Sequence, residues 1–170
     1  MRTRIIVVGV AAGLGALAIA AVLSTRSVAQ NPMGDADAEP APFNPQMAAL
    51  MSMLIQPRHA KLGLAGKAEN WPLAGYALKE LKQGFLVAAR AVPRWKGLPV
   101  PDLIEAALDQ HWAVLDFAIK AGEPRQFSEA YDKITTGCNA CHATTDHAFV
   151  VITAPDSAAA FPNQDFQPKR

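Results

Sequence analysis

Two cysteines and a histidine lie within five residues near the C-terminal end of the chain. Cys138, Cys141 and His142 form a C-x-x-C-H motif in the sequence CNACH. Two thiols at this spacing can bond covalently to the vinyl-derived carbons of a haem, and the adjacent imidazole can bind the iron as an axial ligand. The motif therefore predicts one covalently bound haem c per chain, attached through Cys138 and Cys141 with His142 on the iron.

Three other interpretations of the cysteine pair fit the sequence less well. A disulfide between Cys138 and Cys141 would have poor geometry across a single helical turn. A thioredoxin-like redox pair belongs in a strand–loop–helix setting, which this sequence does not offer. A structural zinc site needs four ligands, and only His142, His147 and distant histidines could complete it. None of the three explains the adjacent histidine as well as haem does.

The first 29 residues have the pattern of an export signal. Arg2 and Arg4 precede an apolar stretch over residues 5–23, and small residues follow at 27–29 where a signal peptidase cleaves. Residues 1–29 are therefore predicted to be a signal peptide that directs the protein to the periplasm, where covalent haem attachment takes place. The stretch is also long enough for an uncleaved anchor, which would tether the protein to the membrane.

Apolar residues recur at helical spacing in four stretches that must position the motif. Pro57 falls inside the first stretch and predicts a kink or a break there. The only β-like run is 149–153, and one run cannot form a sheet. The sequence therefore predicts an all-α fold, an antiparallel four-helix bundle with the haem c site on its last helix. The predicted helices span residues 46–65, 71–91, 102–121 and 124–142. The predicted parts are a signal peptide 1–29, a flexible linker 30–45, a haem-binding domain 46–148 and a C-terminal extension 149–170.

Composition excludes several classes of function. The formal net charge is +1 and there is no run of Lys or Arg, so we expect no nucleic-acid binding. Outside the N-terminal segment the hydropathy is that of a protein with no further membrane spans. Acidic residues are scattered singly, without a carboxylate pair or a Ser/His/Asp set for hydrolytic chemistry. A peroxidase is a weaker option, because it needs a distal acid–base pair and only His59 offers half of one. We therefore expect no enzyme activity.

The late CNACH motif and the four helical stretches resemble the class II c-type cytochromes, the cytochrome c-prime group. The resemblance covers roughly residues 46–148, and the stretch RHAKLGLAGKAENWPLAGYALKEL from Arg58 also resembles one found in exported proteins of this kind. It implies a four-helix bundle with His142 as the proximal iron ligand. Two features depart from the pattern. Pro57 interrupts the first helix, and residues 149–170 extend past the point where typical members end.

The distal iron ligand should come from the first helix, whose start lies near the end of the last helix in such a bundle. Met51 is the favoured candidate, because it shares an apolar stripe with Met47, whereas Met53 points elsewhere. His59 is the alternative distal ligand. Tyr131, two turns before Cys138, is the candidate for packing against the haem.

Two functions follow from the two states of the distal side. With a sixth ligand the protein would be a periplasmic electron-transfer cytochrome that works with redox partner proteins. With an open distal side, walled by Leu50 and Leu54, it would bind small gases such as nitric oxide or carbon monoxide. The sequence is also compatible with a homodimer. His147, five residues past His142, is expected to project to another side of the helix, away from the iron.

Overall fold

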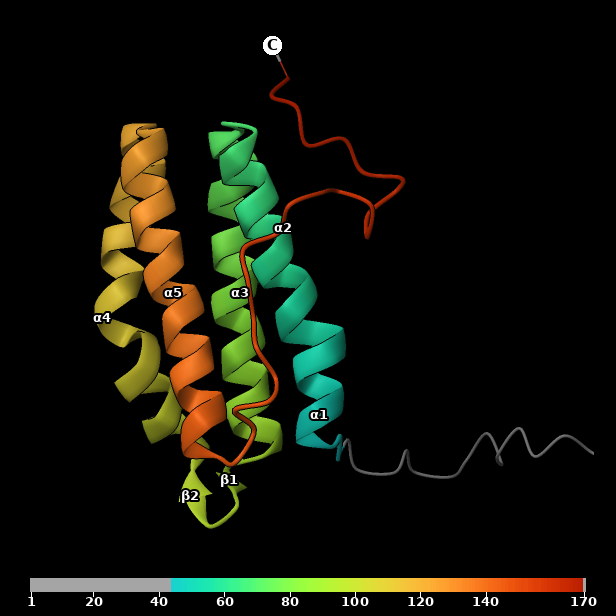
Figure 1. Ribbon diagram of the computed structural model, residues 1–170, viewed down its shortest axis with the longest axis vertical. Coiled ribbons are helices and arrows are strands. Elements are labelled where there is room, and N and C mark those ends of the chain that lie inside the picture. Colours follow the sequence, from blue (N-terminus) through green and yellow to red (C-terminus); the bar gives the residue numbers. More distant parts are fainter. Residues whose placement is uncertain (1–43, 170) are drawn as a thin grey trace, which may run out of the picture. The chain divides into compact units, whose positions relative to one another are not determined.

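A computed structural model describes residues 44–169 of the chain (Figure 1). Within this range the chain is mostly helical, which confirms the predicted all-α class. None of these helices is long and apolar enough to cross a lipid bilayer. The predicted signal peptide 1–29, and all but the last two residues of the predicted linker 30–45, lie outside the described residues. The helices are α1 (Met47–Leu50), the π-helix η1 (Met51–Ile55), α2 (Gln56–Lys67), α3 (Trp71–Ala91), α4 (Val100–Ala121) and α5 (Pro124–Thr144).

The chain passes Pro57 through a widened helical turn. The π-helix η1 connects α1 to α2 directly, and Pro57 lies in the first turn of α2. A proline has no amide hydrogen and its ring crowds the preceding turn, so a π-helical turn gives it room without ending the helix. Arg58 Nη1 donates to the carbonyl oxygen of Leu54 at 2.9 Å. The predicted irregularity therefore takes the form of a π-helix, and the helical path continues from residue 47 to residue 67.

Local capping chemistry sets the other helix ends. The side-chain oxygen of Asn70 accepts a hydrogen bond from the backbone N–H of Leu73 at 3.2 Å, which caps the start of α3. Gly122 follows α4 with a left-handed φ of 68°, a conformation that favours glycine. Pro124 opens α5. Helix α4 begins at Val100, two residues before the predicted start.

A short hairpin lies between α3 and α4, where a connection without strands was predicted. Strand β1 (Arg94–Trp95) pairs antiparallel with β2 (Leu98–Pro99). Lys96 and Gly97 form the turn with φ values of 48° and 81°, the conformation that two-residue hairpin turns favour. The prediction that only 149–153 is β-like was wrong, because that run forms no strand and the hairpin lies elsewhere. Figure 1 shows the hairpin beside the C-terminal end of α5.

Close backbone approaches define how the helices pack. Helices α2 and α3, α3 and α4, and α4 and α5 make the most extensive contacts, and α2 also contacts α5. A Cβ atom on Gly137 of α5 would lie 2.3 Å from the carbonyl oxygen of Ala107 on α4. A Cβ on Gly66 of α2 would lie 1.9 Å from the Phe127 ring on α5. These glycines therefore let α5 approach both neighbours. The largest fully buried side chains are Leu62, Leu81, Leu108, Leu115 and Ile134.

The C-terminal extension packs along the helices. Figure 1 shows it running back from the end of α5 between α5 and α2. Lys67 Nζ donates to the carbonyl oxygen of Asp156 at 3.2 Å, and Asn70 Nδ2 lies 3.1 Å from the carbonyl oxygens of both Phe166 and Gln167. The Phe166 side chain is buried in the core. The extension therefore covers the side of the molecule between α2 and α5, which contact each other less than the other neighbouring long helices do.

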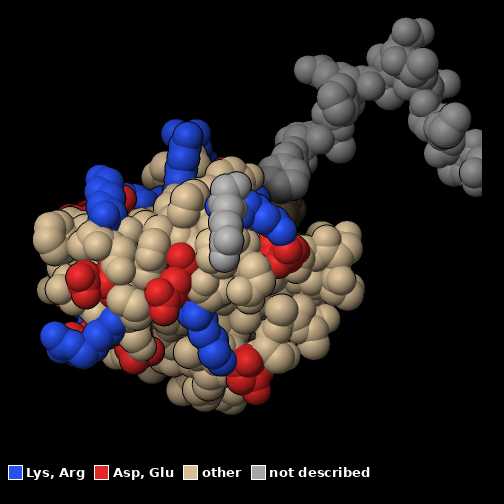
Figure 2. Space-filling model, turned by 90° about the horizontal axis from the view of Figure 1, so that it is seen from above, with Lys and Arg blue, Asp and Glu red and all other residues tan. Residues whose placement is uncertain are grey.

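The charged side chains are mixed in sign. Figure 2 shows Lys and Arg interspersed with Asp and Glu on the face seen from above. Several of the charges pair locally, as Arg125 does with Glu129 at 2.9 Å within α5. Such exposed pairs contribute little to stability, and this face offers no strong field of one sign.

Candidate haem-binding site

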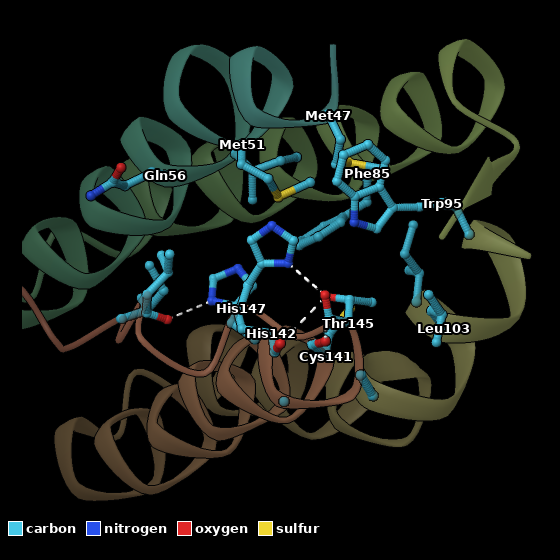
Figure 3. Close-up of a pocket in the computed structure, with 18 of the residues that line it drawn as sticks. Met47, Met51, Gln56, Phe85, Trp95, Leu103, Cys141, His142, Thr145 and His147 are labelled. Atoms are coloured by element: carbon cyan, nitrogen blue, oxygen red, sulfur yellow. Dashed lines mark hydrogen bonds between the residues drawn. The ribbon is translucent and has the colours of Figure 1, made fainter. Parts of the chain in front are cut away.

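The predicted motif lines a cavity of about 220 Å³ (Figure 3). Cys138, Cys141 and His142 reach it from α5, Met51 from η1 and His59 from α2. These residues are separated by up to 91 positions in the sequence. The structure therefore brings the two cysteines and the histidine of the motif, together with both distal candidates, to one cavity.

Apolar side chains form most of the cavity wall. They come from α1, η1, α3, β1, α4 and the C-terminal extension. An apolar wall suits a group that is itself largely apolar, because burying that surface is favourable. The apolar residues outside the predicted site are Met47, Ile55, Phe85, Trp95, Val100, Leu103, Ile104, Leu108, Val150 and Ile152.

The hydrogen bond of His142 fixes which ring nitrogen is free. Its Nδ1 lies 2.8 Å from the carbonyl oxygen of Val150. Since a carbonyl can only accept, Nδ1 carries the hydrogen and the lone pair of the neutral ring resides on Nε2. This is the arrangement of a metal-binding histidine, whose second nitrogen donates to a carbonyl or carboxylate. The side chain of His142 is thus prepared to bind a metal through Nε2.

The two thiols are free and poorly ionised. Burial raises the pKa of Cys138 to about 12, with a further contribution from the nearby Cys141. Burial also raises the pKa of Cys141. Reactive redox thiols have lowered pKa values, which increase the fraction of thiolate. The surroundings of this pair therefore do not favour thiol–disulfide catalysis.

The three methionines of the first helix differ in their surroundings. Met47 and Met51 both line the cavity, whereas Met53 is 79% exposed. Met51 is the first residue of η1 and is half-buried. The stripe predicted from sequence thus agrees with the structure: Met47 and Met51 face the cavity and Met53 faces away from it.

His59 lines the same cavity, but both of its ring nitrogens have protein partners. Nε2 lies 2.9 Å from Thr135 Oγ1, and Nδ1 lies 3.0 Å from the Tyr131 hydroxyl. Thr135 donates its own hydrogen to the Tyr131 carbonyl, so it accepts from Nε2–H of His59. Burial lowers the pKa of His59 to about 4, so the ring is neutral at pH 7.

Tyr131, the candidate for haem packing, does not line the cavity. Its ring stacks on His59 at a centroid distance of 4.7 Å and on Phe127 at 5.8 Å. Gly63 leaves room for it, since a Cβ there would lie 2.7 Å from the phenol. The hydrogen bonds to His59 direct the phenol toward α2, and burial raises the pKa of Tyr131.

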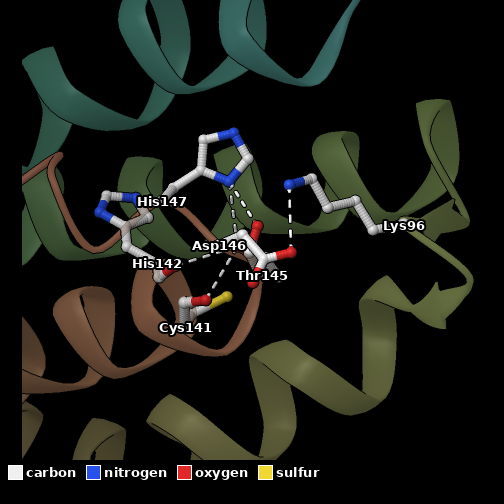
Figure 4. Close-up of polar contacts among 6 residues, drawn as sticks. All are labelled: Lys96, Cys141, His142, Thr145, Asp146 and His147. Atoms are coloured by element: carbon white, nitrogen blue, oxygen red, sulfur yellow. Dashed lines mark hydrogen bonds and ion pairs between the residues drawn. The ribbon is translucent and has the colours of Figure 1, made fainter.

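His147 is the residue that the sequence interpretation placed wrongly. It lines the same cavity as His142 rather than projecting to another side of the helix. Helix α5 ends at Thr144, and Asp146 turns the chain with a φ of 60°. The Nδ1 of His147 donates to the carbonyl oxygen of Thr145 at 2.6 Å, while Lys96 of the hairpin turn pairs with Asp146 at 3.4 Å (Figure 4). The sequence interpretation had placed His147 by helical geometry from His142, although the chain leaves the helix after Thr144.

Comparisons with protein-family models, with curated proteins and with solved structures found no match. Among residues 44–169, no group of three or more His, Cys, Asp or Glu side chains is placed to hold a metal ion.

Proposed function

We propose that this protein is an exported electron-transfer cytochrome with one haem c. Cys138 and Cys141 would hold the haem covalently, and His142 would be the proximal iron ligand. In this proposal the helices form an antiparallel four-helix bundle similar to that of class II c-type cytochromes, preceded by a signal peptide. The observation that carries the proposal is the position of the motif. Both thiols and a histidine with a free Nε2 line one apolar cavity.

The chemistry of the cavity residues fits a haem c. A haem needs two thiols one helical turn apart, an imidazole beside them and an apolar wall. The cavity supplies all three, and the Val150 carbonyl leaves Nε2 of His142 as the nitrogen available to iron. When bound, the haem supplies an iron that exchanges one electron between its ferrous and ferric states. No catalytic residue belongs to the proposal.

The contribution of the chain is to hold the ligands still and to keep water out. His142 lies on α5, whose position is fixed by close packing against α4 at Gly137. Apolar side chains such as Phe85 and Leu108 in the cavity wall offer water no hydrogen-bond partners. A rigid, apolar surrounding keeps the structural change on electron transfer small and helps to set the reduction potential. A periplasmic redox protein is the proposed partner.

Met51 is the distal ligand that we propose. A thioether is uncharged and needs little desolvation, so it suits an apolar cavity. His59 is less suited, because iron binding would require at least one of its two hydrogen bonds to break. The small-gas alternative predicted a wall of Leu50 and Leu54, neither of which lines the cavity. We therefore keep gas binding as an outcome of the test and not as a second proposal.

Haem staining of a denaturing gel tests the proposal. The full chain is exported in a host that attaches haem c, and the wild type is compared with the double variant Cys138→Ser/Cys141→Ser. Ala143→Ser, an exposed change next to the motif, is the matched control. We expect staining of the wild type and the control and none of the double variant. A wild-type band without stain, or a double variant that stains equally, would overturn the haem assignment.

A further inference from the structure

The side chain of Asn139 binds the C-terminal extension with both of its polar atoms. Its Nδ2 donates to the carbonyl oxygen of Ile152 at 2.9 Å, and its Oδ1 accepts from the backbone N–H of Ile152 at 2.8 Å. Two hydrogen bonds from one amide to one residue fix both the position and the direction of that backbone. Asn139 is one of the two residues between the cysteines of the motif.

This contact lies next to the hydrogen bond of the axial histidine. Val150, whose carbonyl oxygen accepts from Nδ1 of His142, is two residues before Ile152. Asn139 and His142 are three residues apart on α5, so they lie on the same side of the helix. The backbone N–H of Val150 also donates to the carbonyl oxygen of His147 at 2.8 Å. The segment that returns from the end of α5 is thus held at both Val150 and Ile152.

The far end of the extension is anchored separately. Asn70 binds the carbonyl oxygens of Phe166 and Gln167, and Phe166 is buried among the helices. The side chains of Val150 and Ile152 themselves line the cavity. The extension is therefore part of the wall of the site. Hydrogen bonds tie it to α5 at Val150 and Ile152, and to Asn70 near its far end.

We propose that Asn139 and the extension together position His142 and set the electron-donating strength of its imidazole. This inference rests on the proposed function, because it concerns the histidine as an iron ligand. A carbonyl that accepts from Nδ1–H increases the basicity of Nε2 and fixes the ring orientation. A more basic ligand stabilises the ferric state relative to the ferrous state. The extension thus lowers the reduction potential of the site, with Asn139 as a positioning residue.

The test compares the exported full chain with the variants Asn139→Ala and Asn163→Ala. Asn163 is an exposed asparagine of the extension and serves as the matched control. Three properties are measured: covalent haem on a denaturing gel, the reduction potential, and the rate of deuterium exchange at the Ile152 amide. In Asn139→Ala we expect unchanged haem staining and faster exchange at Ile152. At a fixed solution potential we expect the ferrous-to-ferric ratio to rise about tenfold, or about 59 mV for one electron.

The readouts separate this inference from the proposed function. A wild type that carries no haem overturns the proposed function, and the tuning role of Asn139 with it. Haem-loaded Asn139→Ala with an unchanged potential overturns the inference alone, as does unchanged exchange at Ile152. Asn139→Leu, with a side chain of similar size, is the second variant, because it removes both hydrogen bonds to Ile152 in the full chain. It should shift the potential in the same direction, and a shift the opposite way would also overturn the inference.

Discussion

Tyr131 and His59 contact each other through both their rings and their polar atoms. The rings stack at an angle of 27°, and the Tyr131 hydroxyl lies 2.9 Å from the His59 carbonyl oxygen and 3.0 Å from Nδ1. One residue is on α5 and the other on α2. The pair therefore joins the first and last long helices through a buried polar network that Thr135 completes. Such a network stabilises the fold only while its histidine remains neutral.

The stability of the protein is expected to fall in mild acid because of His59. Its pKa is about 4 in the folded state and about 6.5 when unfolded, so the unfolded state binds the extra proton first as the pH falls. The free energy of unfolding should decrease from pH 7 to pH 4.5 by about 2 kcal/mol through this group. Urea unfolding at both pH values measures it. In His59→Gln this part of the decrease should be absent, whereas His111→Gln on α4 should retain it. Equal pH dependence in the wild type and His59→Gln would contradict the prediction.

Replacing Gly137 by alanine should push α5 away from α4. The added Cβ would lie 2.3 Å from a backbone oxygen of Ala107 and 2.6 Å from a methyl of Leu108, and a backbone atom cannot move aside cheaply. We expect a loss of about 2 kcal/mol in the free energy of unfolding. Gly75→Ala is the control, since its nearest neighbour is 3.8 Å away, and it should gain up to about 1 kcal/mol from helix propensity. If thermal unfolding shows the same shift for both variants, the close approach at Gly137 is not as described.

The C-terminal extension should contribute to stability through Phe166. Its ring is 7% exposed and meets Phe161 edge to face at a centroid distance of 5.9 Å. Phe166→Ala is expected to cost about 3 kcal/mol in urea unfolding, the low end for a buried phenylalanine. Phe149→Ala changes the same residue type in the same segment at a position that is 81% exposed. It should change stability by less than about 0.5 kcal/mol. Similar small effects at both positions would show that the extension is not packed on the helices.

Local chemistry made much of the fold predictable from sequence. Asn70, Gly122 and Pro124 mark helix ends through a cap, a left-handed φ and a missing amide hydrogen, and each acts within one turn of itself. Residue spacing likewise located the C-x-x-C-H motif and the cavity-facing Met47 and Met51. These features depend on neighbours in the sequence, so the sequence alone is enough to reveal them.

The features that were missed depend on distant contacts or on where a helix stops. The pairing of His59 with Tyr131 joins positions 72 residues apart, and it turns Tyr131 away from the cavity. The path of the extension depends on Asn139, which looked like an ordinary polar residue, and on the side-chain amide of Asn70, a residue that sequence marked only as a helix cap. His147 was misplaced because the turn after Thr144 could not be located from helical spacing. The parts of the site that sequence could not supply are thus those built by tertiary contacts.

The distal side gives the last prediction. Met51 and Met47 both line the cavity with His142, and a thioether on iron would give a six-coordinate, low-spin haem. Met51→Ala should convert the reduced protein to a high-spin form that binds carbon monoxide rapidly. The visible spectrum of the reduced protein, before and after addition of carbon monoxide, measures both changes.

Three further variants decide which residue, if any, is the ligand. Met53→Ala is the control for loss of a methionine from the same helix, because this side chain is 79% exposed and should leave the spectrum unchanged. Met47→Ala should also remain low-spin, since Met47 is expected to fill core space. A change in His59→Ala alone would assign the imidazole instead, and at least one of its hydrogen bonds to Tyr131 and Thr135 would then have to be broken in the haem-bound protein. If no replacement changes the spin state and the wild type already binds carbon monoxide rapidly, the sixth position is open and the protein is a gas binder rather than an electron carrier.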